Sequence, residues 1–166
     1  MSVNSRPIIV LALLFAAACT DHSVRNKAAD YLALRYAAEA GDEPLARALL
    51  ERGTPVDPLD IDAAGELTLG VAEADSPLQI AAKRGHTEIV RLLLQHHPWV
   101  DHRCCTAPSA LVYAAENGHA GVVRLLLDAG ADASIASDAG TALESAQRAG
   151  HTDVVAVLNS NVATSN

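Results

Sequence analysis

The segment 76–86 reads SPLQIAAKRGH, and the segment 109–119 repeats it as SALVYAAENGH, 33 residues later. The similarity continues past each Gly-His pair, where 89–94 reads IVRLLL and 122–127 reads VVRLLL. A period of this length is typical of stacked supersecondary units that share one elongated core. The sequence therefore predicts a repeat protein, and chemistry at a catalytic site is a secondary hypothesis.

Two further units lie outside this pair. The segment 141–151, TALESAQRAGH, follows the third unit in register, and the segment 32–41, LALRYAAEAG, precedes the second. The first and second units are 44 residues apart instead of 33, which indicates an insertion between Gly53 and Ser76. We expect four repeats, at approximately 28–53, 76–101, 109–134 and 141–159.

Each unit is predicted to contain two helices. In the third unit Leu111, Ala114 and Ala115 form one apolar stripe of a short helix, and the small alanines permit close helix approach. Gly118 can adopt the positive φ that ends a helix. The next segment, 122–127, is too apolar to be solvated on more than one side. No unit can bury these stripes alone, so only a stack of units is expected to be stable.

This pattern resembles the ankyrin repeat family, whose consensus runs Thr-Pro-Leu-His, two alanines, Gly-His, a leucine-rich helix and Gly-Ala-Asp. The resemblance covers approximately 28–159 and rests on SPL at 76–78, GAD at 130–132 and three Gly-His pairs. It implies an all-α solenoid of about four helix-turn-helix units with finger loops. The consensus histidine that ties neighbouring units together is replaced by Gln79, Val112 and Glu144, so we expect ordinary or modest stability.

The histidines of the Gly-His pairs are His86, His119 and His151, and each opens the second helix of its unit. A side chain that recurs once per unit is expected to serve the unit itself. We therefore interpret these histidines as structural and not as ligands or catalysts.

The first 18 residues have the layout of a secretory signal peptide. Arg6 precedes an uncharged run, 7–18, that is short for a bilayer span. The sequence Ala16-Ala17-Ala18-Cys19 resembles the lipobox of bacterial lipoproteins, although leucine is commoner at the position of Ala16. The resemblance implies cleavage before Cys19, a lipid on this cysteine and, from Thr20, outer-membrane sorting. Soluble export after ordinary cleavage and an uncleaved anchor are the alternatives.

The chain is acidic, with 12 Lys and Arg against 20 Asp and Glu, a formal net charge of −8. Removal of 1–18 takes away only Arg6 among the charged residues and makes the net charge −9. This balance argues against a nucleic-acid partner and against broad contact with anionic lipid. The length suits a single domain, with 19–27 as a polar linker and 160–166 as a flexible tail.

No motif indicates an enzyme. The sequence has no Ser-His-Asp order, phosphate-binding glycine loop or pair of catalytic carboxylates in a recognisable context. We therefore expect no enzymatic activity and no cofactor.

The segment 54–75 is an acidic insertion without a single Lys or Arg. Its apolar residues partly alternate around Gly65, a pattern consistent with a longer hairpin at the finger edge. Three interpretations stay open. The segment is a solvated loop, an extension of the binding surface toward a basic patch of a partner, or a calcium site that uses Asp57, Asp60 and Asp62 without the usual loop spacing.

A second unusual segment contains His96, His97, His102, Cys104 and Cys105. In register His97 takes the place of Gly130, so the segment is a finger loop with uncommon residues. A packed loop, a thiol or disulfide role and a metal site are the alternatives. A bridge between Cys104 and Cys105 would be strained, because consecutive Cα atoms lie only about 3.8 Å apart. The last two alternatives would make the chain a metal- or redox-active envelope protein.

Partners of ankyrin-like stacks usually contact the finger tips and the exposed end of each first helix, which together form one groove. Mixed charges there suit a protein surface better than a small anion. Trp99 is the only tryptophan. If exposed, it would be an anchor for a partner; if buried, it would only fill the core between repeats. The expected partner-binding residues are Glu39, Ala40, Lys83, Arg84, Glu116, Asn117, Gln147 and Arg148 on the helices, and Ala72, Glu73, Asp75, Trp99, Cys105, Thr106, Asp138 and Ala139 on the fingers.

These features lead to one principal expectation, an exported interaction module that protects or neutralises one partner protein in the bacterial envelope. Resemblance to bacterial ankyrin proteins implies two partner classes, envelope enzymes of oxidant defence such as catalases, and secreted toxins. The expected location is the periplasm, with a lipid on Cys19 as the membrane anchor. A purely structural envelope lipoprotein is a further alternative.

Overall fold

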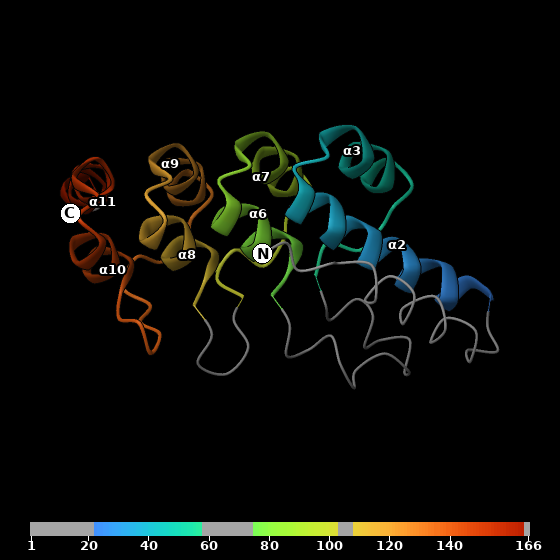
Figure 1. The fold of residues 1–166 in the computed structure, drawn as a ribbon, viewed down its shortest axis with the longest axis horizontal. Coiled ribbons are helices and arrows are strands. Elements are labelled where there is room, and N and C mark those ends of the chain that lie inside the picture. Colours follow the sequence, from blue (N-terminus) through green and yellow to red (C-terminus); the bar gives the residue numbers. More distant parts are fainter. Residues whose placement is uncertain (1–21, 58–74, 103–107, 165–166) are drawn as a thin grey trace, which may run out of the picture.

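The computed structural model describes residues 22–57, 75–102 and 108–164, and within these ranges it contains eight helices and no strands. The first unit comprises α2 (His22–Ala40) and α3 (Glu43–Glu51), and the second comprises α6 (Pro77–Arg84) and α7 (Thr87–Leu94). The third comprises α8 (Ala110–Glu116) and α9 (Ala120–Asp128), and the fourth comprises α10 (Ala142–Ala149) and α11 (Thr152–Thr164). Each predicted repeat is therefore one helix pair (Figure 1).

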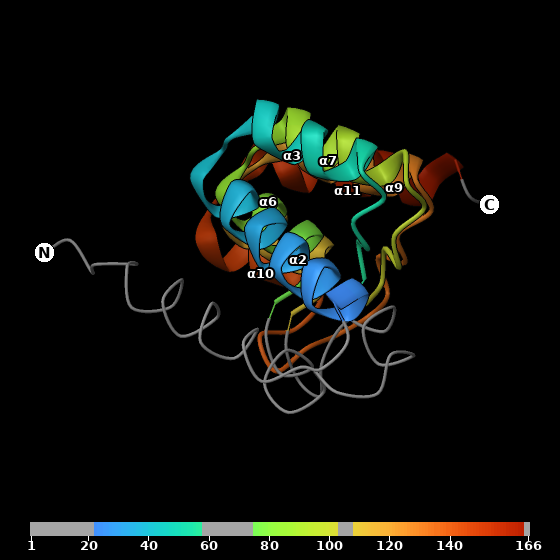
Figure 2. The ribbon, with the colours of Figure 1, turned by 90° about the vertical axis from the view of Figure 1, so that its right-hand side faces the viewer.

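The helices are stacked in two layers. Figures 1 and 2 show an inner layer of α2, α6, α8 and α10 and an outer layer of α3, α7, α9 and α11. The main helix contacts join the two helices of one unit or equivalent helices of consecutive units. The described loop between α9 and α10 projects from the inner layer on the side away from the outer helices (Figure 1). The all-α solenoid with finger loops is thus confirmed.

The helical region extends beyond the predicted domain at both ends. α2 begins at His22, so residues 22–27 of the predicted polar linker are helical. α11 continues to Thr164 and includes residues 160–164 of the predicted flexible tail. The segment 25–29, RNKAA, contains strong helix formers, and no Gly or Pro interrupts the chain after Gly150. Strong helix formers therefore extend α2, whereas α11 continues because no glycine or proline ends it.

Hydroxyl side chains begin the inner helices of units two to four. Ser76, Ser109 and Thr141 each accept a hydrogen bond from the backbone N–H three residues later, which satisfies one free donor of the first turn. In α6 and α10 the third helical residue, Gln79 or Glu144, also accepts a hydrogen bond from the backbone N–H of the cap. These reciprocal bonds place the starts of the helices where the repeat pattern predicts them.

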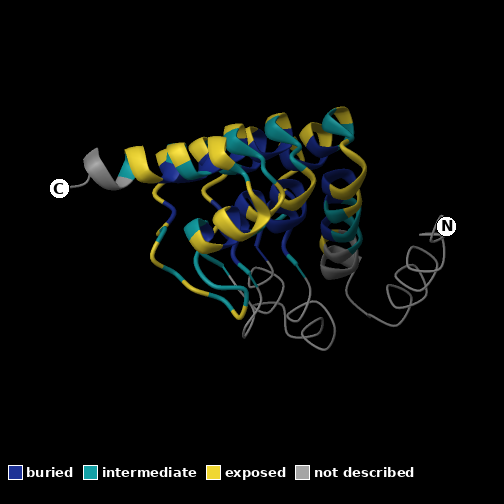
Figure 3. Ribbon diagram, turned by 60° about the vertical axis from the view of Figure 1, so that its left-hand side comes forward, coloured by how far each residue is buried: buried dark blue, intermediate teal, exposed yellow. Residues whose placement is uncertain are grey.

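The core between the layers consists of small residues on the inner helices and branched residues on the outer helices. Ala81 and Ala114 are fully buried, as are Leu93 and Leu126 of α7 and α9. Figure 3 shows the buried residues on the facing sides of the two layers and the exposed residues of the outer helices on the far side. The alanines allow the inner helices to lie close to their neighbours, as the sequence predicts.

Each Gly-His histidine contacts the preceding unit. Nε2 of His119 donates to the backbone carbonyl of Lys83 at 3.2 Å, and Nε2 of His151 donates to that of Glu116 at 3.1 Å. His86 lies in the same way, with its Nε2 3.4 Å from the carbonyl of Glu39. These contacts confirm the structural interpretation of the three histidines.

The first unit has Asp42 where the later units have histidine. The carboxylate of Asp42 accepts a hydrogen bond from the backbone N–H of Leu45 at 3.0 Å and so caps its own helix, α3. His86 and His119 make no such cap bond to α7 and α9. The residue at this position therefore either caps its own helix or joins its unit to the one before.

Gln79 takes over the role of the consensus histidine in the second unit. Its side-chain nitrogen donates to the carbonyl of Pro108, at the start of the third unit, at 2.9 Å. Its side-chain oxygen accepts from the backbone N–H of Ser76 at 2.8 Å. Gln79 is only 2% exposed; its bond to Ser76 is buried and its bond to Pro108 is partly buried. The replacement of histidine by Gln79 therefore keeps a tie between units two and three.

Replacing Gln79 by alanine is expected to lower the free energy of unfolding by about 1 to 3 kcal/mol, because it leaves the buried N–H of Ser76 and the partly buried carbonyl of Pro108 without these partners. Urea unfolding followed by far-UV circular dichroism measures this loss. Gln147→Ala is the matched control, since Gln147 is exposed on α10, and its effect is expected within about 0.5 kcal/mol. Equal losses in the two variants would contradict the tie.

The outward side of the fourth unit is polar where the earlier units are apolar. Glu144, Gln147 and Asn159 are exposed. They stand in register with the residues of unit three that the fourth unit covers, Val112, Ala115 and Leu127, which are 1%, 0% and 9% exposed. Polar side chains at these positions keep the outer face of a terminal repeat compatible with water.

Candidate partner-binding surface

One row of predicted binding residues lies at equivalent places on the four inner helices. Glu39, Lys83, Glu116 and Arg148 each stand two residues before the glycine that follows their helix, and all four are exposed. We call these four residues the groove row. Its charges alternate along the stack, because acidic Glu39 and Glu116 take turns with basic Lys83 and Arg148.

The structure places Gln147 outside this row. Its register matches Ala82 and Ala115, which face the next unit and are fully buried. Gln147 is exposed because no described unit covers α10 on that side. It therefore lies on the polar outer face of the fourth unit and not at the exposed end position that the sequence analysis assigned to it.

The cations of the second unit already have partners within the chain. Arg84 forms an ion pair with Glu39 of the first unit. Nζ of Lys83 lies 4.7 Å from the centre of the Tyr113 ring of the third unit, a cation–π contact. Neighbouring units thus share their groove charges, so the charge left for a partner is smaller than the sequence indicates.

Asp75 joins three units. Its carboxylate accepts a hydrogen bond from the Tyr113 hydroxyl at 3.1 Å, and its backbone carbonyl accepts one from Nε of Arg35 at 3.0 Å. Burial, and next to it the negative charge of Asp75, raises the pKa of Tyr113 to about 12. The phenol is therefore a stable neutral donor at physiological pH, and Asp75 links the first and third units to its own.

Two tyrosines of this surface were missed by the sequence analysis. Tyr36 and Tyr113 share one register position, with Ile80 and Ser145 in the other units. Tyr36 is 45% exposed, whereas Tyr113 lies under Lys83. The signal available in the sequence was a variable position that stands three residues before each residue of the groove row. Residues three apart lie on the same face of a helix, so this position neighbours the groove row.

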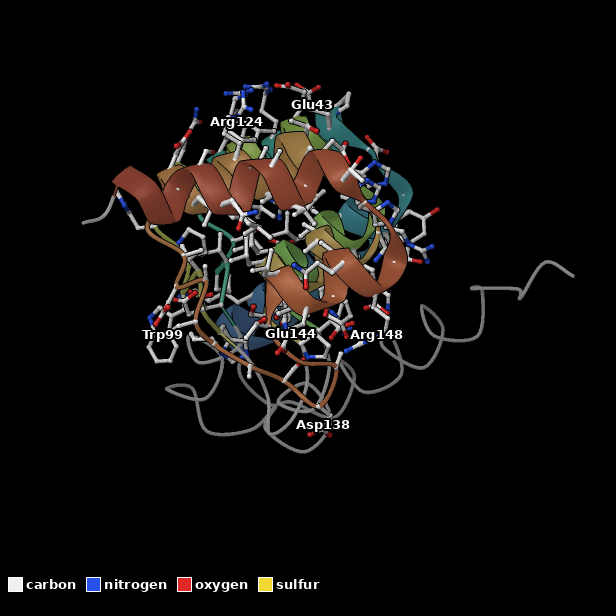
Figure 4. All side chains as sticks on the ribbon, turned by 90° about the vertical axis from the view of Figure 1, so that its left-hand side faces the viewer. Glu43, Trp99, Arg124, Asp138, Glu144 and Arg148 are labelled. Carbon is white, nitrogen blue, oxygen red and sulfur yellow. The ribbon has the colours of Figure 1, made fainter. Side chains whose placement is uncertain are left out.

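Trp99 is exposed, with 57% of its surface in contact with solvent. This outcome favours the anchor interpretation over core padding. Figure 4 shows Trp99 and Arg148 on opposite sides of the molecule, with Asp138 at the tip of the described finger loop below them. The repeat pattern predicts these three residues in one groove, whereas Trp99 lies at the back of the fingers, away from Arg148 (Figure 4).

The backbone around Trp99 is fixed. Both carboxylate oxygens of Asp57 accept from the N–H of Trp99, at 3.2 and 3.0 Å. One unit later, the carboxylate of Asp101 accepts from the N–H of Asp132 at 3.1 Å in the same way. His97 adopts a φ of +52° where other units have glycine. Aspartates therefore link consecutive fingers at their bases.

Several predicted residues lie outside the described part of the chain. They include Asp60 and Asp62 of the calcium hypothesis, and most of the insertion 54–75. Among the described residues, no group of three or more His, Cys, Asp or Glu side chains is placed to hold a metal ion. The other predicted residues outside this part are Cys19, Ala72, Glu73, Cys104, Cys105 and Thr106.

Comparison with known proteins identifies the repeats. The family model of ankyrin repeats, in three copies, matches residues 4–97, 34–137 and 100–165. No curated protein matches the chain. Ankyrin repeats are modules of protein–protein interaction and typically lack enzymatic activity. Because the matches span most of the sequence and the helix pairs form the expected stack, the chain belongs to the ankyrin repeat family.

Proposed function

We propose that this chain is exported to the bacterial envelope, where its groove binds one partner protein and protects or neutralises it. The observation that carries the proposal is the exposed groove row, Glu39, Lys83, Glu116 and Arg148, at the ends of four consecutive inner helices. Tyr36, 45% exposed beside this row, adds an aromatic side chain of the kind that is enriched at binding hot spots.

The internal pairing of the groove charges indicates which partner surface would fit. Arg84 is paired with Glu39, and Lys83 covers Tyr113. A strongly charged partner would have to break these contacts, whereas a partner with mixed polar and aromatic groups would add to them. A folded protein surface matches this description better than a polyanion. Both partner classes of the sequence analysis, an enzyme of oxidant defence and a secreted toxin, offer such a surface.

Export and anchoring rest on the sequence of residues 1–19. Within the described residues, no helix has both the length and the hydropathy that a membrane span needs. We propose that cleavage before Cys19 exposes this cysteine to lipidation, which would attach the chain to a membrane. Mass spectrometry of the N-terminal peptide tests this step. A diacylated or triacylated Cys19 supports the anchor, and an unmodified Cys19 at the N-terminus supports soluble export instead.

Affinity capture of the natively exported chain from its own envelope tests the binding function. We expect one stoichiometric partner, identified by mass spectrometry. If this partner is a toxin, co-expression of this chain should protect the host cells from it. If the partner is an enzyme, co-expression of this chain should make the enzyme stay active longer under oxidant stress. Recovery of no partner would contradict the proposal and would favour a structural lipoprotein or a metal- or redox-active protein.

The double variant Lys83→Glu/Arg84→Glu is expected to keep the fold and to weaken partner binding at least about tenfold, because it reverses two charges in the groove. Loss of the exposed pair with Glu39 should cost the fold no more than about 1 kcal/mol. Isothermal titration with the captured partner measures the affinity, and circular dichroism checks the fold.

The matched control is Arg91→Glu/Arg124→Glu, which makes the same charge change on exposed positions of the outer helices α7 and α9. Arg124 lies far from Arg148 in Figure 4. The control should bind as the wild type does. Equal weakening in both double variants would show a general charge effect, and unchanged affinity in the groove variant would place the binding surface elsewhere.

A further inference from the structure

Trp99 is a solvent-exposed aromatic residue whose backbone is held by hydrogen bonds, and the repeat architecture does not require it. The equivalent residues of the first and third units are Pro55 and Asp132. Asp57, which is 8% exposed, holds the backbone N–H of Trp99 through both carboxylate oxygens. Trp99 nevertheless remains 57% exposed. A large side chain on a fixed backbone loses little conformational entropy when it binds, which is the property of an anchor.

The ring has only one aromatic neighbour among the described residues. The imidazole of His102 lies 6.3 Å from the indole, centre to centre, with the ring planes inclined by 50°. This tilted contact orients the indole but does not cover it, as its exposure shows. More than half of the Trp99 surface is therefore accessible to a ligand.

Two aspartates belong to the same finger-base region as this tryptophan, Asp101 on its own finger and Asp132 at the equivalent position of the next finger. Asp101 follows Trp99 by two residues, and its carboxylate binds the backbone N–H of Asp132, so these two aspartates lie next to each other. The carboxylate of Asp132 also accepts from the N–H and the hydroxyl of Ser134, which lowers its pKa. Asp132 is exposed and stays ionised near neutral pH.

No Lys or Arg occurs in the described finger-base segments 95–102 and 128–140, which together contain four aspartates. Arg103, the next cation along the chain, lies outside the described residues. The surface therefore combines an exposed indole with local negative charge. A cation has two favourable contacts there, with the face of the ring and with the carboxylates.

We propose that Trp99, Asp101 and Asp132 form a second binding surface, at the back of the fingers, which binds an arginine- or lysine-containing segment of a protein partner. The cationic side chain stacks on the indole, and the two carboxylates complement its charge. This surface is separate from the groove, since Trp99 and Arg148 lie on opposite sides of the molecule (Figure 4). The chain would thus contact a basic segment and a folded partner surface at the same time.

The probe is a capped seven-residue peptide in which Arg and Lys alternate with Gly, and the control is the same peptide with Glu at the charged positions. Because Trp99 is the only tryptophan, its fluorescence reports binding at this surface directly. We expect saturable quenching or a spectral shift with the basic peptide and none with the acidic one. Equal responses to the two peptides, or no response to either, would overturn the proposal.

Variants separate a cation–π contact from simple apolar docking. With a fluorescein-labelled basic peptide, Trp99→Leu is expected to weaken binding about 2- to 30-fold, the range that a cation–π contact covers, and Trp99→Phe is expected to weaken it less. Equal affinity of Trp99→Leu and the wild type would overturn the proposal. Asp132→Asn removes one negative charge at an exposed position and leaves Trp99 in place. It should weaken peptide binding and make the affinity depend less on salt concentration. An unchanged salt dependence would contradict a role of the carboxylates in binding.

A variant of the groove row separates peptide binding at Trp99 from partner binding in the groove, on which the proposed function rests. Lys83→Gln/Arg84→Gln alters the groove but leaves the back of the fingers intact, so it should bind the basic peptide as the wild type does. Loss of peptide binding in this variant would overturn a separate surface. Failure to capture a groove partner from the envelope, in contrast, would leave the peptide result standing.

Discussion

Replacing Gly85 by alanine is expected to lower the free energy of unfolding by about 2 to 5 kcal/mol. Gly85 ends α6 with a φ of +75°, a conformation that costs an L-residue about 1 to 2 kcal/mol. A Cβ at this position would also lie 2.6 Å from Cε1 and Nδ1 of His119, closer than any normal contact. The imidazole would have to leave the carbonyl of Lys83, and the tie between units two and three would be lost. Urea unfolding at equilibrium measures the effect.

Gly150→Ala is the matched control. Gly150 has nearly the same φ, +79°, but no heavy atom lies within 4 Å of a Cβ built there. The control should therefore lose only the conformational term, about 1 to 2 kcal/mol. The difference in free energy of unfolding between the losses of Gly85→Ala and Gly150→Ala reports the clash with His119. The loss caused by Gly85→Ala should be smaller when it is measured in a protein that already carries His119→Ala. Equal losses at Gly85 and Gly150 would show that the imidazole moves aside without cost.

Replacing Leu126 by alanine is expected to cost about 2 to 5 kcal/mol, because the side chain is fully buried between the layers and its removal leaves a cavity. Leu93, at the equivalent place in α7, is also 0% exposed and should respond similarly. Thermal and urea unfolding of both variants measures the loss.

Leu125→Ala provides the comparison for Leu126, since Leu125 is adjacent in sequence but only partly buried. Its loss should be clearly smaller. An unchanged unfolding midpoint for Leu126→Ala would contradict its place in the core, whatever the result at Leu125.

The stack was predictable from the sequence because its determinants recur. The Gly-His pairs, the double alanines and the leucine-rich helices each appear at one spacing, and each occupies the expected place, as Leu126 and His119 illustrate. The recurrence of the histidines also predicted their structural role. Local patterns of this kind are reliable because every unit buries the same apolar positions against its neighbours.

The contacts of the candidate surfaces were not predictable, because they join residues that share no pattern. Tyr113 reaches Asp75 across 38 residues, and Lys83 covers the same ring. The side of the finger on which Trp99 lies depends on the hydrogen bonds from its backbone to Asp57, 42 residues away. Nor did the family consensus predict that Gln79 would bind the carbonyl of Pro108. Long-range pairs of single side chains leave no periodic signal in one sequence.

The histidine ties have a consequence for the shape of the groove. The principal contacts between described helices link only consecutive units, so the curvature of the stack is the sum of small rotations at three boundaries. The radius of the groove therefore depends on alanines such as Ala115 and on ties such as that of His151, which a partner need not touch. A substitution at such a boundary would change which partner shapes fit, while every side chain in the groove stayed the same.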